Sequence, residues 1–305
     1  MTAKEQKKDL AASVRQRLLN AAQETSTPFD EVLLRYAMER FLYRLSRSAY
    51  ASRFVLKGAL LLDTWGAALY RPTRDIDLLG RLHNDPEEIA SAVKAICIQP
   101  VEPDGLVFDA DSVRAVRITE EAVYEGVRVS FKGELARARI TMQIDIGFGD
   151  AVVPAPAKIM LPARFDLPPV RMQGYTRDSV IAEKFETMMK LGIINSRLKD
   201  YYDIWLLSQR FEFDGERVAT AIKTTFARRG TEFRLRPTAL SEKFVTDPTK
   251  VAQWTALRRK ARLDDAPASL DAIITRLRRF LGPIIKALVE GKTYSGTWPP
   301  GGPWK

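Results

Sequence analysis

Two aspartates stand at alternate positions of a short, otherwise apolar segment, Asp75-Ile-Asp77-Leu-Leu79. Alternate residues of a β-strand share one face, so the two carboxylates should lie together, opposite the apolar side chains. A third carboxylate, Asp145, falls on the polar side of the alternating segment 138–147. If the two strands pair with both apolar faces on one core, the three aspartates meet on the other face.

Three like charges at one point repel each other and need a counter-cation. Oxygen ligands suit Mg²⁺ or Mn²⁺, and two such ions can activate an attacking hydroxyl and stabilise a leaving pyrophosphate. A lone Asp-x-Asp is usually only a solvated strand surface. The third carboxylate and the preceding Lys57-Gly58 turn favour a metal site, because glycine lets the backbone approach a phosphate closely.

Other catalytic chemistry has few residues to use. The 305 residues include one histidine, His83, and one cysteine, Cys97. Serine or cysteine nucleophiles that need a histidine base, His-based metal sites and cysteine-rich zinc sites are therefore disfavoured. The charged N-terminus lacks the apolar core of a signal peptide, and no run of about 18 apolar residues exists. We therefore expect a cytoplasmic protein with no membrane partner.

The basic excess lies in the C-terminal third. The net charge is +10, and residues 211–305 hold 18 of the 48 Lys and Arg but 10 of the 38 Asp and Glu. A basic face can line a nucleic-acid backbone, although it can equally be a solvated helix surface, so charge favours a polyanionic partner only slightly. The clustered basic residues are Arg228, Arg229, Arg234, Arg236, Arg258, Arg259, Lys260, Arg262, Arg276, Arg278 and Arg279.

The hydrophobic periodicity predicts helices, then a mixed sheet, then a helical C-terminal part, which is an α+β fold. We expect Thr27 to cap the second helix, with Pro28 first, and Asp85 to cap the third. The Pro-rich stretch 148–177 should wrap the surface. The predicted helices are 8–23, 28–47, 85–97, 178–192, 197–210, 213–228, 249–262 and 268–289. The predicted strands are 53–57, 75–79, 114–118, 127–131 and 138–147. The predicted domains are 1–50, 51–170 and 171–290, followed by a Gly/Pro/Trp tail, 291–305, that is either disordered or laid against the body.

Two charges fall on or beside apolar helix faces in the C-terminal half. Lys184 lies beside the apolar side of the helix 178–192, and Asp200 aligns with the apolar side of the next helix. An unpaired charge there would cost on the order of several kcal/mol, so the two should meet. They could form a structural ion pair or stay at the rim, or Lys184 could reach a nucleotide phosphate while Asp200 orients it. We expect Asp203 to be a helix-surface or interdomain contact.

The candidate residues fall within short motifs, which in chain order are Lys57-Gly58-Ala59-Leu60, Arg71-Pro-Thr-Arg-Asp75-Ile-Asp77-Leu, Asp145, Ala182-Glu183-Lys184 and Arg197-Leu-Lys-Asp200-Tyr-Tyr-Asp203. These motifs resemble those of the DNA polymerase β-like nucleotidyltransferases, and more narrowly the AbiEii/AbiGii toxin family. The resemblance extends over about residues 40–210, and the C-terminal part is similar in layout only.

This resemblance implies a polymerase β-like core at 51–170 that transfers a nucleoside monophosphate from an NTP to RNA, with Mg²⁺ or Mn²⁺. It also implies a tRNA 3′ end as acceptor and a growth-inhibiting toxin with a cognate antitoxin. The implied metal ligands are Asp75, Asp77 and Asp145, the other residues needed for activity are Lys184 and Asp200, and the nucleotide-binding residues are Lys57, Gly58, Ala59 and Thr73.

The chain departs from the family pattern at two places. Ala59 and Leu60 stand where members usually carry a small Gly or Ser followed by Thr, so the hydroxyl is lost there. Thr73 stands where Ser is common, and a hydroxyl is kept.

Three alternatives remain open from sequence. The first is a nucleotidyltransferase that modifies protein hydroxyls. The second is a phosphotransferase that modifies itself at Thr73, where about two added negative charges beside the carboxylates would block metal and nucleotide binding. The third is a non-catalytic RNA- or partner-binding module.

Overall fold

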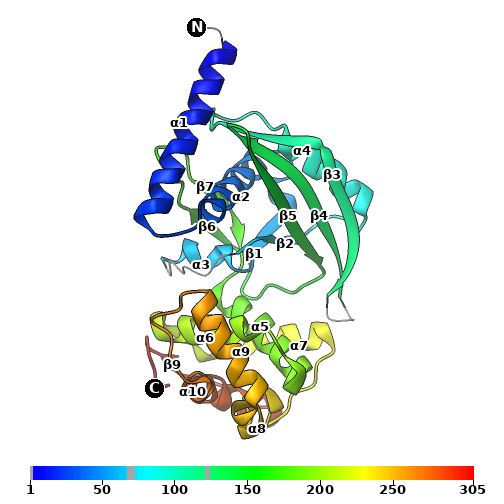
Figure 1. Ribbon diagram of the computed structural model, residues 1–305. Helices are drawn as coiled ribbons and strands as arrows, with labels where there is room; N and C mark the ends of the chain where they lie inside the picture. Colours follow the sequence, from blue (N-terminus) through cyan, green and yellow to red (C-terminus); the bar gives the residue numbers. More distant parts are fainter. Residues whose placement is uncertain (1–2, 67–72, 121–123) are drawn as a thin grey trace. The chain divides into compact units, whose positions relative to one another are not determined.

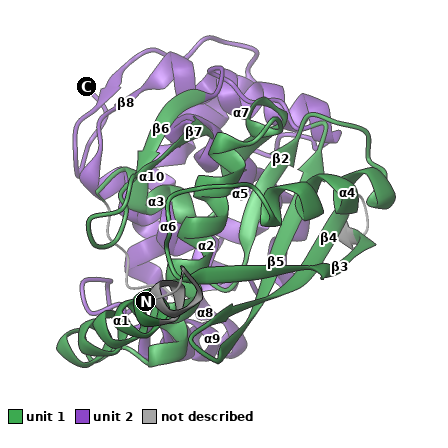
Figure 2. Cartoon of the chain, turned by 90° about the horizontal axis from the view of Figure 1, so that it is seen from above, with its two compact units in different colours: residues 1–149, 157–174 green, residues 150–156, 175–305 purple. Residues whose placement is uncertain are grey.

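The computed structural model describes residues 3–66, 73–120 and 124–305, and Arg71 of the quoted motif lies outside them. The chain divides into two compact units (Figure 2). Unit 1 comprises Met1–Gly149 and Ala157–Gly174, and unit 2 comprises Asp150–Pro156 and Tyr175–Lys305. The sheet flanked by helices and followed by further helices is the predicted α+β class (Figure 1).

Unit 1 is built on a mixed sheet in the order β3-β4-β5-β2-β1-β7-β6. The β2/β5 and β1/β7 pairs are parallel and the others are antiparallel. On β5 the apolar residues alternate with polar ones as predicted, and the apolar side is buried. The strands are β1 (Phe54–Lys57), β2 (Ile76–Gly80), β3 (Leu106–Glu120), β4 (Tyr124–Leu135), β5 (Ala138–Phe148), β6 (Ala157–Leu161) and β7 (Val170–Gly174).

The helices of unit 1 include α2 (Phe29–Arg47), which packs against β5 and β7 and buries most of its length. The cap prediction for this helix was wrong: Pro28 is the N-cap residue, and the Thr27 hydroxyl donates instead to the Thr25 carbonyl. The prediction for α4 is confirmed, since Asp85 accepts a hydrogen bond from the Glu87 amide. The other elements are α1 (Ala3–Glu24), α3 (Leu60–Thr64), α4 (Pro86–Cys97) and a 3₁₀ turn, Ala51–Arg53.

A buried ion cluster ties α2 to the start of β3. Nη1 and Nη2 of Arg44 donate to the Asp104 carboxylate, at 2.6 and 3.0 Å, and Nε of Arg40 donates to it at 3.1 Å. Asp104 also accepts from the backbone amide of Leu106. Because all three side chains are nearly inaccessible to solvent, the pairing offsets the cost of burying their charges.

Unit 2 is helical, and α10 buries a continuous apolar face that includes Leu277, Phe280 and Leu281. The main helices are α5 (Arg177–Leu191), α6 (Leu198–Arg210), α7 (Gly215–Arg229), α9 (Pro248–Lys260) and α10 (Leu270–Val289). Shorter elements are α8 (Glu242–Thr246), 3₁₀ turns at Gly192–Ile194 and Thr238–Leu240, and the strands β8 (Phe213–Asp214) and β9 (Thr297–Trp298).

The tail, 291–305, lies against the body of unit 2, which is one of the two alternatives expected from the sequence; the other was disorder. The β9 strand pairs with β8, and the indole of Trp298 is fully buried, with Nε1 2.7 Å from the Ser208 carbonyl. Trp304 stacks on Phe280 at 5.5 Å between ring centroids. The tail therefore contributes aromatic area to the core of unit 2.

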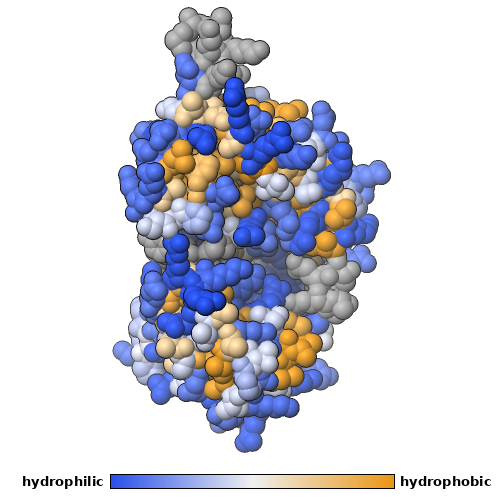
Figure 3. Space-filling model, in the orientation of Figure 1, coloured by the Kyte–Doolittle hydropathy of each residue, from blue (hydrophilic) through white to orange (hydrophobic). Residues whose placement is uncertain are grey.

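No helix among the described residues is long and apolar enough to cross a membrane. Large exposed apolar side chains are scattered along the chain, among them Val107, Ile194 and Leu235. Most of the surface visible in Figure 3 is hydrophilic.

Candidate active site

The structure brings Asp75, Asp77 and Asp145 together, with one carboxylate oxygen from each lying within 4.8 Å of the others. Asp75 precedes β2, Asp77 lies within it, and Asp145 is the parallel partner of Asp77 on β5. Asp145 is buried, and the other two are half-buried. Their oxygen-only donor set and spacing fit a divalent cation such as Mg²⁺ or Mn²⁺.

Asp77 and Asp145 are the middle members of a row of four charged residues across four adjacent strands. Lys57 on β1 is in register with Asp77, which is in register with Asp145, which is in register with Arg128 on β4. Residues paired in register point to the same face of a sheet. The row therefore reads cation, carboxylate, carboxylate, cation.

Gly58 and Thr73 shape the approach to the carboxylates. Gly58 has a φ of +74°, and a Cβ at this position would overlap the Asp77 side chain, so glycine is required. The Thr73 hydroxyl lies 3.0 Å from Oδ1 of Asp75 and orients that carboxylate. Ala59 follows the glycine directly, and Leu60 begins α3 as a core residue that is 1% exposed.

Arg128 is a member of the site that the sequence analysis did not identify. Its Nε and Nη2 each donate to one oxygen of Asp145, both at 2.8 Å. The signal available in the sequence was the alternation of Arg128 with Val127 and Val129, which places it on the polar face of β4. The register that puts it opposite Asp145 depends on the tight turn at Ala136 and Arg137, both of which have positive φ.

Unit 2 joins Lys184 to Asp200, with Nζ 2.6 Å from Oδ1, so the two predicted charges do meet. The expectation for Asp203 was wrong: it is fully buried, and its Oδ2 lies 2.8 Å from Lys184 Nζ. Asp203 shares a helix face with Asp200, three residues earlier. Burial alone would raise the pKa of Asp200, but the charges of Lys184 and Arg197 outweigh it and hold the pKa below its ordinary value.

Some residues of the predicted basic face are structural. Arg229 is only 11% exposed and pairs with Asp150, Glu183 and Glu186, while the guanidinium of Arg278 donates to the Leu240 carbonyl at 2.6 Å. Arg276 donates to the Gly301 carbonyl in the tail. The exposed members of the face are Arg228, Arg234, Arg236, Arg259, Lys260, Arg262 and Arg279.

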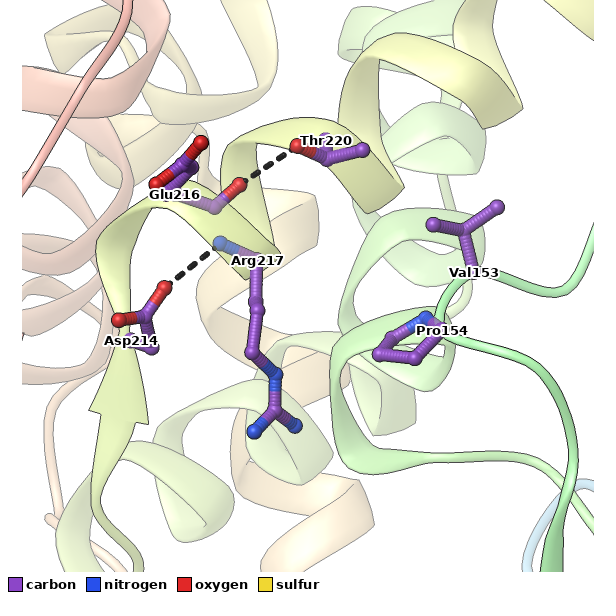
Figure 4. Close-up of a pocket in the computed structure, with 6 residues that line it drawn as sticks. All are labelled: Val153, Pro154, Asp214, Glu216, Arg217 and Thr220. Atoms are coloured by element: carbon purple, nitrogen blue, oxygen red, sulfur yellow. Dashed lines mark hydrogen bonds between the residues drawn. The ribbon is translucent and has the colours of Figure 1, made fainter.

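A pocket in unit 2 involves none of the predicted site residues (Figure 4). Asp214 caps α7 by accepting from the Arg217 amide at 2.8 Å, and the Thr220 hydroxyl donates to the Glu216 carbonyl. The Arg217 side chain pairs with the buried carboxylate of Asp178. These groups serve the start of α7, so we assign the pocket no chemistry. Its lining is Val153, Pro154, Asp214, Glu216, Arg217 and Thr220.

Residues 40–276, well over half of the chain, match the family model described as the nucleotidyl transferase AbiEii toxin of type IV toxin–antitoxin systems. The chain belongs to this family. This AbiEii protein is therefore a nucleotidyltransferase toxin with a cognate antitoxin, and the resemblance inferred from the motifs is confirmed. The match reaches beyond residue 210 into the helices that the sequence motifs related to the family in layout only.

No curated protein matches the AbiEii chain. Among solved structures, JHP933 from Helicobacter pylori is 15% identical, with a TM-score of 0.46, and the alignment covers 85% of this chain and 92% of that one. A second structure, a candidate nucleotidyltransferase from H. pylori, is 16% identical with a TM-score of 0.44, covering 84% and 95%.

Proposed function

We propose that this AbiEii toxin transfers a nucleoside monophosphate from an NTP to RNA, at the 3′ end of a tRNA, in the cytoplasm. The observation that carries the proposal is the triad of carboxylates beside the Gly58 turn, in a chain that belongs to a nucleotidyltransferase family. The exposed arginines and lysines of unit 2 support a polyanionic acceptor.

Asp75, Asp77 and Asp145 would hold the divalent cations, Mg²⁺ or Mn²⁺. Such ions, when bound, offset the charge of the triad, favour ionisation of the acceptor hydroxyl and stabilise the leaving pyrophosphate. Thr73 keeps the Asp75 carboxylate oriented, and Gly58 lets the chain turn beside Asp77 without a clash. Both residues reduce the reorganisation that binding requires.

In the transfer, the acceptor oxygen forms a bond to the α-phosphorus while the bond from that phosphorus to the bridging oxygen of the pyrophosphate breaks. The acceptor proton is lost to solvent, and pyrophosphate leaves. We assign binding of the triphosphate to Lys57, Gly58 and Ala59, through the ammonium group and backbone amides. The work of the protein is positioning and charge compensation rather than covalent catalysis.

Lys184 would reach the nucleotide phosphates, and Asp200 would orient its ammonium group. The Lys184 side chain is 15% exposed, and its two carboxylate partners, Asp200 and Asp203, hold its ammonium group in position. The same ion pairs also stabilise the α5–α6 contact, so any test must separate the two roles.

The experiment is to incubate the protein with Mg²⁺, total tRNA and each α-labelled NTP in turn, beside the Asp75→Ala, Asp77→Ala variant. We expect label on RNA with the native protein only, and the labelled nucleotide identifies the NTP. Label on protein would replace RNA with a protein acceptor. Binding of tRNA without transfer of any label would refute the proposal.

A further inference from the structure

Arg128 pairs with Asp145, the most buried of the three carboxylates of the site. Asp145 accepts one charged N–H on each oxygen, both at 2.8 Å, which is the bidentate geometry of a strong arginine–carboxylate pair. The Asp145 side chain is 9% exposed. A cation that binds Asp145 must therefore share or displace these hydrogen bonds.

The charges of the site explain why an arginine lies there. Three carboxylates with oxygens within 4.8 Å repel each other, and a positive charge beside one of them relieves that repulsion. Arg128 supplies such a charge from the end of the four-residue row.

The arginine is also accessible to solvent. Its side chain is 42% exposed, whereas the structural Arg229 of unit 2 is 11% exposed. An incoming cation can therefore approach the Arg128–Asp145 pair from the solvent side.

We propose that Arg128 is a resident counter-cation that competes with the divalent ion for Asp145. The inference rests on the proposed function, because it concerns the same metal-binding carboxylates. Arg128 holds Asp145 in place before the metal binds and weakens metal binding to the free enzyme. Arg128 is thus a positioning residue that sets how readily the triad takes up its cation.

The test is direct binding of Mn²⁺, followed from the electron paramagnetic resonance signal of the free ion, with no NTP or RNA present. Arg128→Gln removes the positive charge and the paired N–H donors that contact both oxygens of Asp145, but keeps a polar side chain. We expect this variant to bind Mn²⁺ about tenfold more tightly, the scale of one lost hydrogen bond to a charged group. Arg128→Lys keeps the positive charge but lacks the bidentate geometry, so its affinity for Mn²⁺ should lie between those of Arg128→Gln and the native protein.

The matched control is Arg117→Gln, an exposed arginine on β3 that pairs with Glu125 on the surface, and it should bind Mn²⁺ like the native protein. Asp77→Asn should lose Mn²⁺ binding in every background. Urea unfolding of each variant checks that the sheet is intact, and Arg128→Lys replaces Arg128→Gln if the latter does not fold.

The outcomes separate the inference from the proposed function. Equal or weaker Mn²⁺ binding by the folded Arg128 variants, with binding still dependent on Asp77, overturns the role of Arg128 and leaves the metal site standing. Absence of Mn²⁺ binding from the native protein and all variants overturns both the role of Arg128 and the metal site. Tighter Mn²⁺ binding by Arg128→Gln, with Arg128→Lys between it and the native protein and Arg117→Gln unchanged, supports the inference.

Discussion

Lys184 lies against the fully buried Asp203, with Nζ 2.8 Å from Oδ2, and the same ammonium group also contacts Asp200. One lysine from α5 thus contacts two carboxylates of α6, and Arg197 contacts one of them, Asp200. This arrangement makes Lys184 a structural residue whatever else it does. A loss of activity on its replacement would not by itself identify a catalytic role.

Replacing Lys184 with methionine should lower the free energy of unfolding by about 3–5 kcal/mol, because it removes the ammonium group that two buried carboxylates share. Urea denaturation measures the change. Lys223→Met, on the exposed side of α7, is the control and should stay within about 0.5 kcal/mol of the native protein.

A triple variant, Lys184→Met with Asp200→Asn and Asp203→Asn, separates the two roles of Lys184. Removing the carboxylate charges should restore much of the stability. If transfer returns with stability, the Lys184–Asp200 pair is structural only. If transfer stays absent in a stable protein, this pair also acts on the substrate.

Asp200 should make stability depend on pH in the acid range. Its pKa is held below the ordinary value of 3.8 in the folded protein, so the folded state binds this proton less readily than the unfolded state. Its stabilising contribution is therefore complete above the unfolded pKa and is lost as the pH falls through the folded pKa. The gap in unfolding free energy between the native protein and Asp200→Asn should be constant from pH 7 to 5 and shrink below about pH 4. A gap that widens in acid would contradict this sign.

Gly58→Ala should reduce transfer by about a hundredfold, the scale of a misplaced reacting group, because the new methyl group overlaps the Asp77 carboxylate. Gly66→Ala is a matched control. Gly66 also has a positive φ, +66°, but among the described residues, its chain neighbours apart, no atom lies within 4 Å of the added Cβ. Both variants should lose about 1 kcal/mol of stability through backbone strain. Equal transfer rates for the two variants would remove Gly58 from the site.

Cys97 should resist alkylation in the folded protein. Burial raises the pKa of its thiol to about 12, so little thiolate exists at pH 8, and the side chain is 5% exposed. A thiol reagent such as iodoacetamide should label the protein only after urea unfolding. Rapid labelling under native conditions would show that α4 opens easily.

Charge reversal on unit 2 tests whether its exposed basic residues bind the proposed tRNA acceptor. Arg259→Glu with Lys260→Glu should weaken tRNA binding at least about tenfold and reduce its dependence on salt. The control is Lys94→Glu with Lys132→Glu, the same charge change at two exposed positions of unit 1. Equal effects of the two pairs would show that net charge, rather than a basic face on unit 2, attracts the RNA.

The sequence predicted the elements whose patterns are local. Alternation along 138–147 was sufficient to place Asp145 on the polar face of its strand, and Asp85-Pro86 marked the start of α4. The strands β6 and β7 were not predicted, because each has five residues within the Pro-rich stretch that was expected to wrap the surface. The helices α3 and α8 were also missed, because five residues are too few to establish a helical period.

Side-chain pairs between residues that are distant in the sequence were harder to predict from local patterns. Arg128 and Arg229 have ordinary sequence surroundings, yet one lies opposite Asp145 and the other lies among three acids. Asp203 carried a usable signal, since it stands three residues after Asp200 on one helix face. Its burial still depends on Lys184, which arrives from a different helix.

The assignment of Asp150–Pro156 to unit 2 has a consequence for the biosynthesis of the protein and for cutting it into pieces. The carboxylate of Asp150 meets the guanidinium of Arg229, 79 residues later, and the Val153 carbonyl accepts from the Ser179 hydroxyl. On the ribosome, this short segment emerges before β6 and β7 and must wait for α7 to be translated. A fragment that begins at Tyr175 would hold every helix of unit 2 but leave Arg229 without one of its acidic partners, so a single proteolytic cut cannot yield two complete halves.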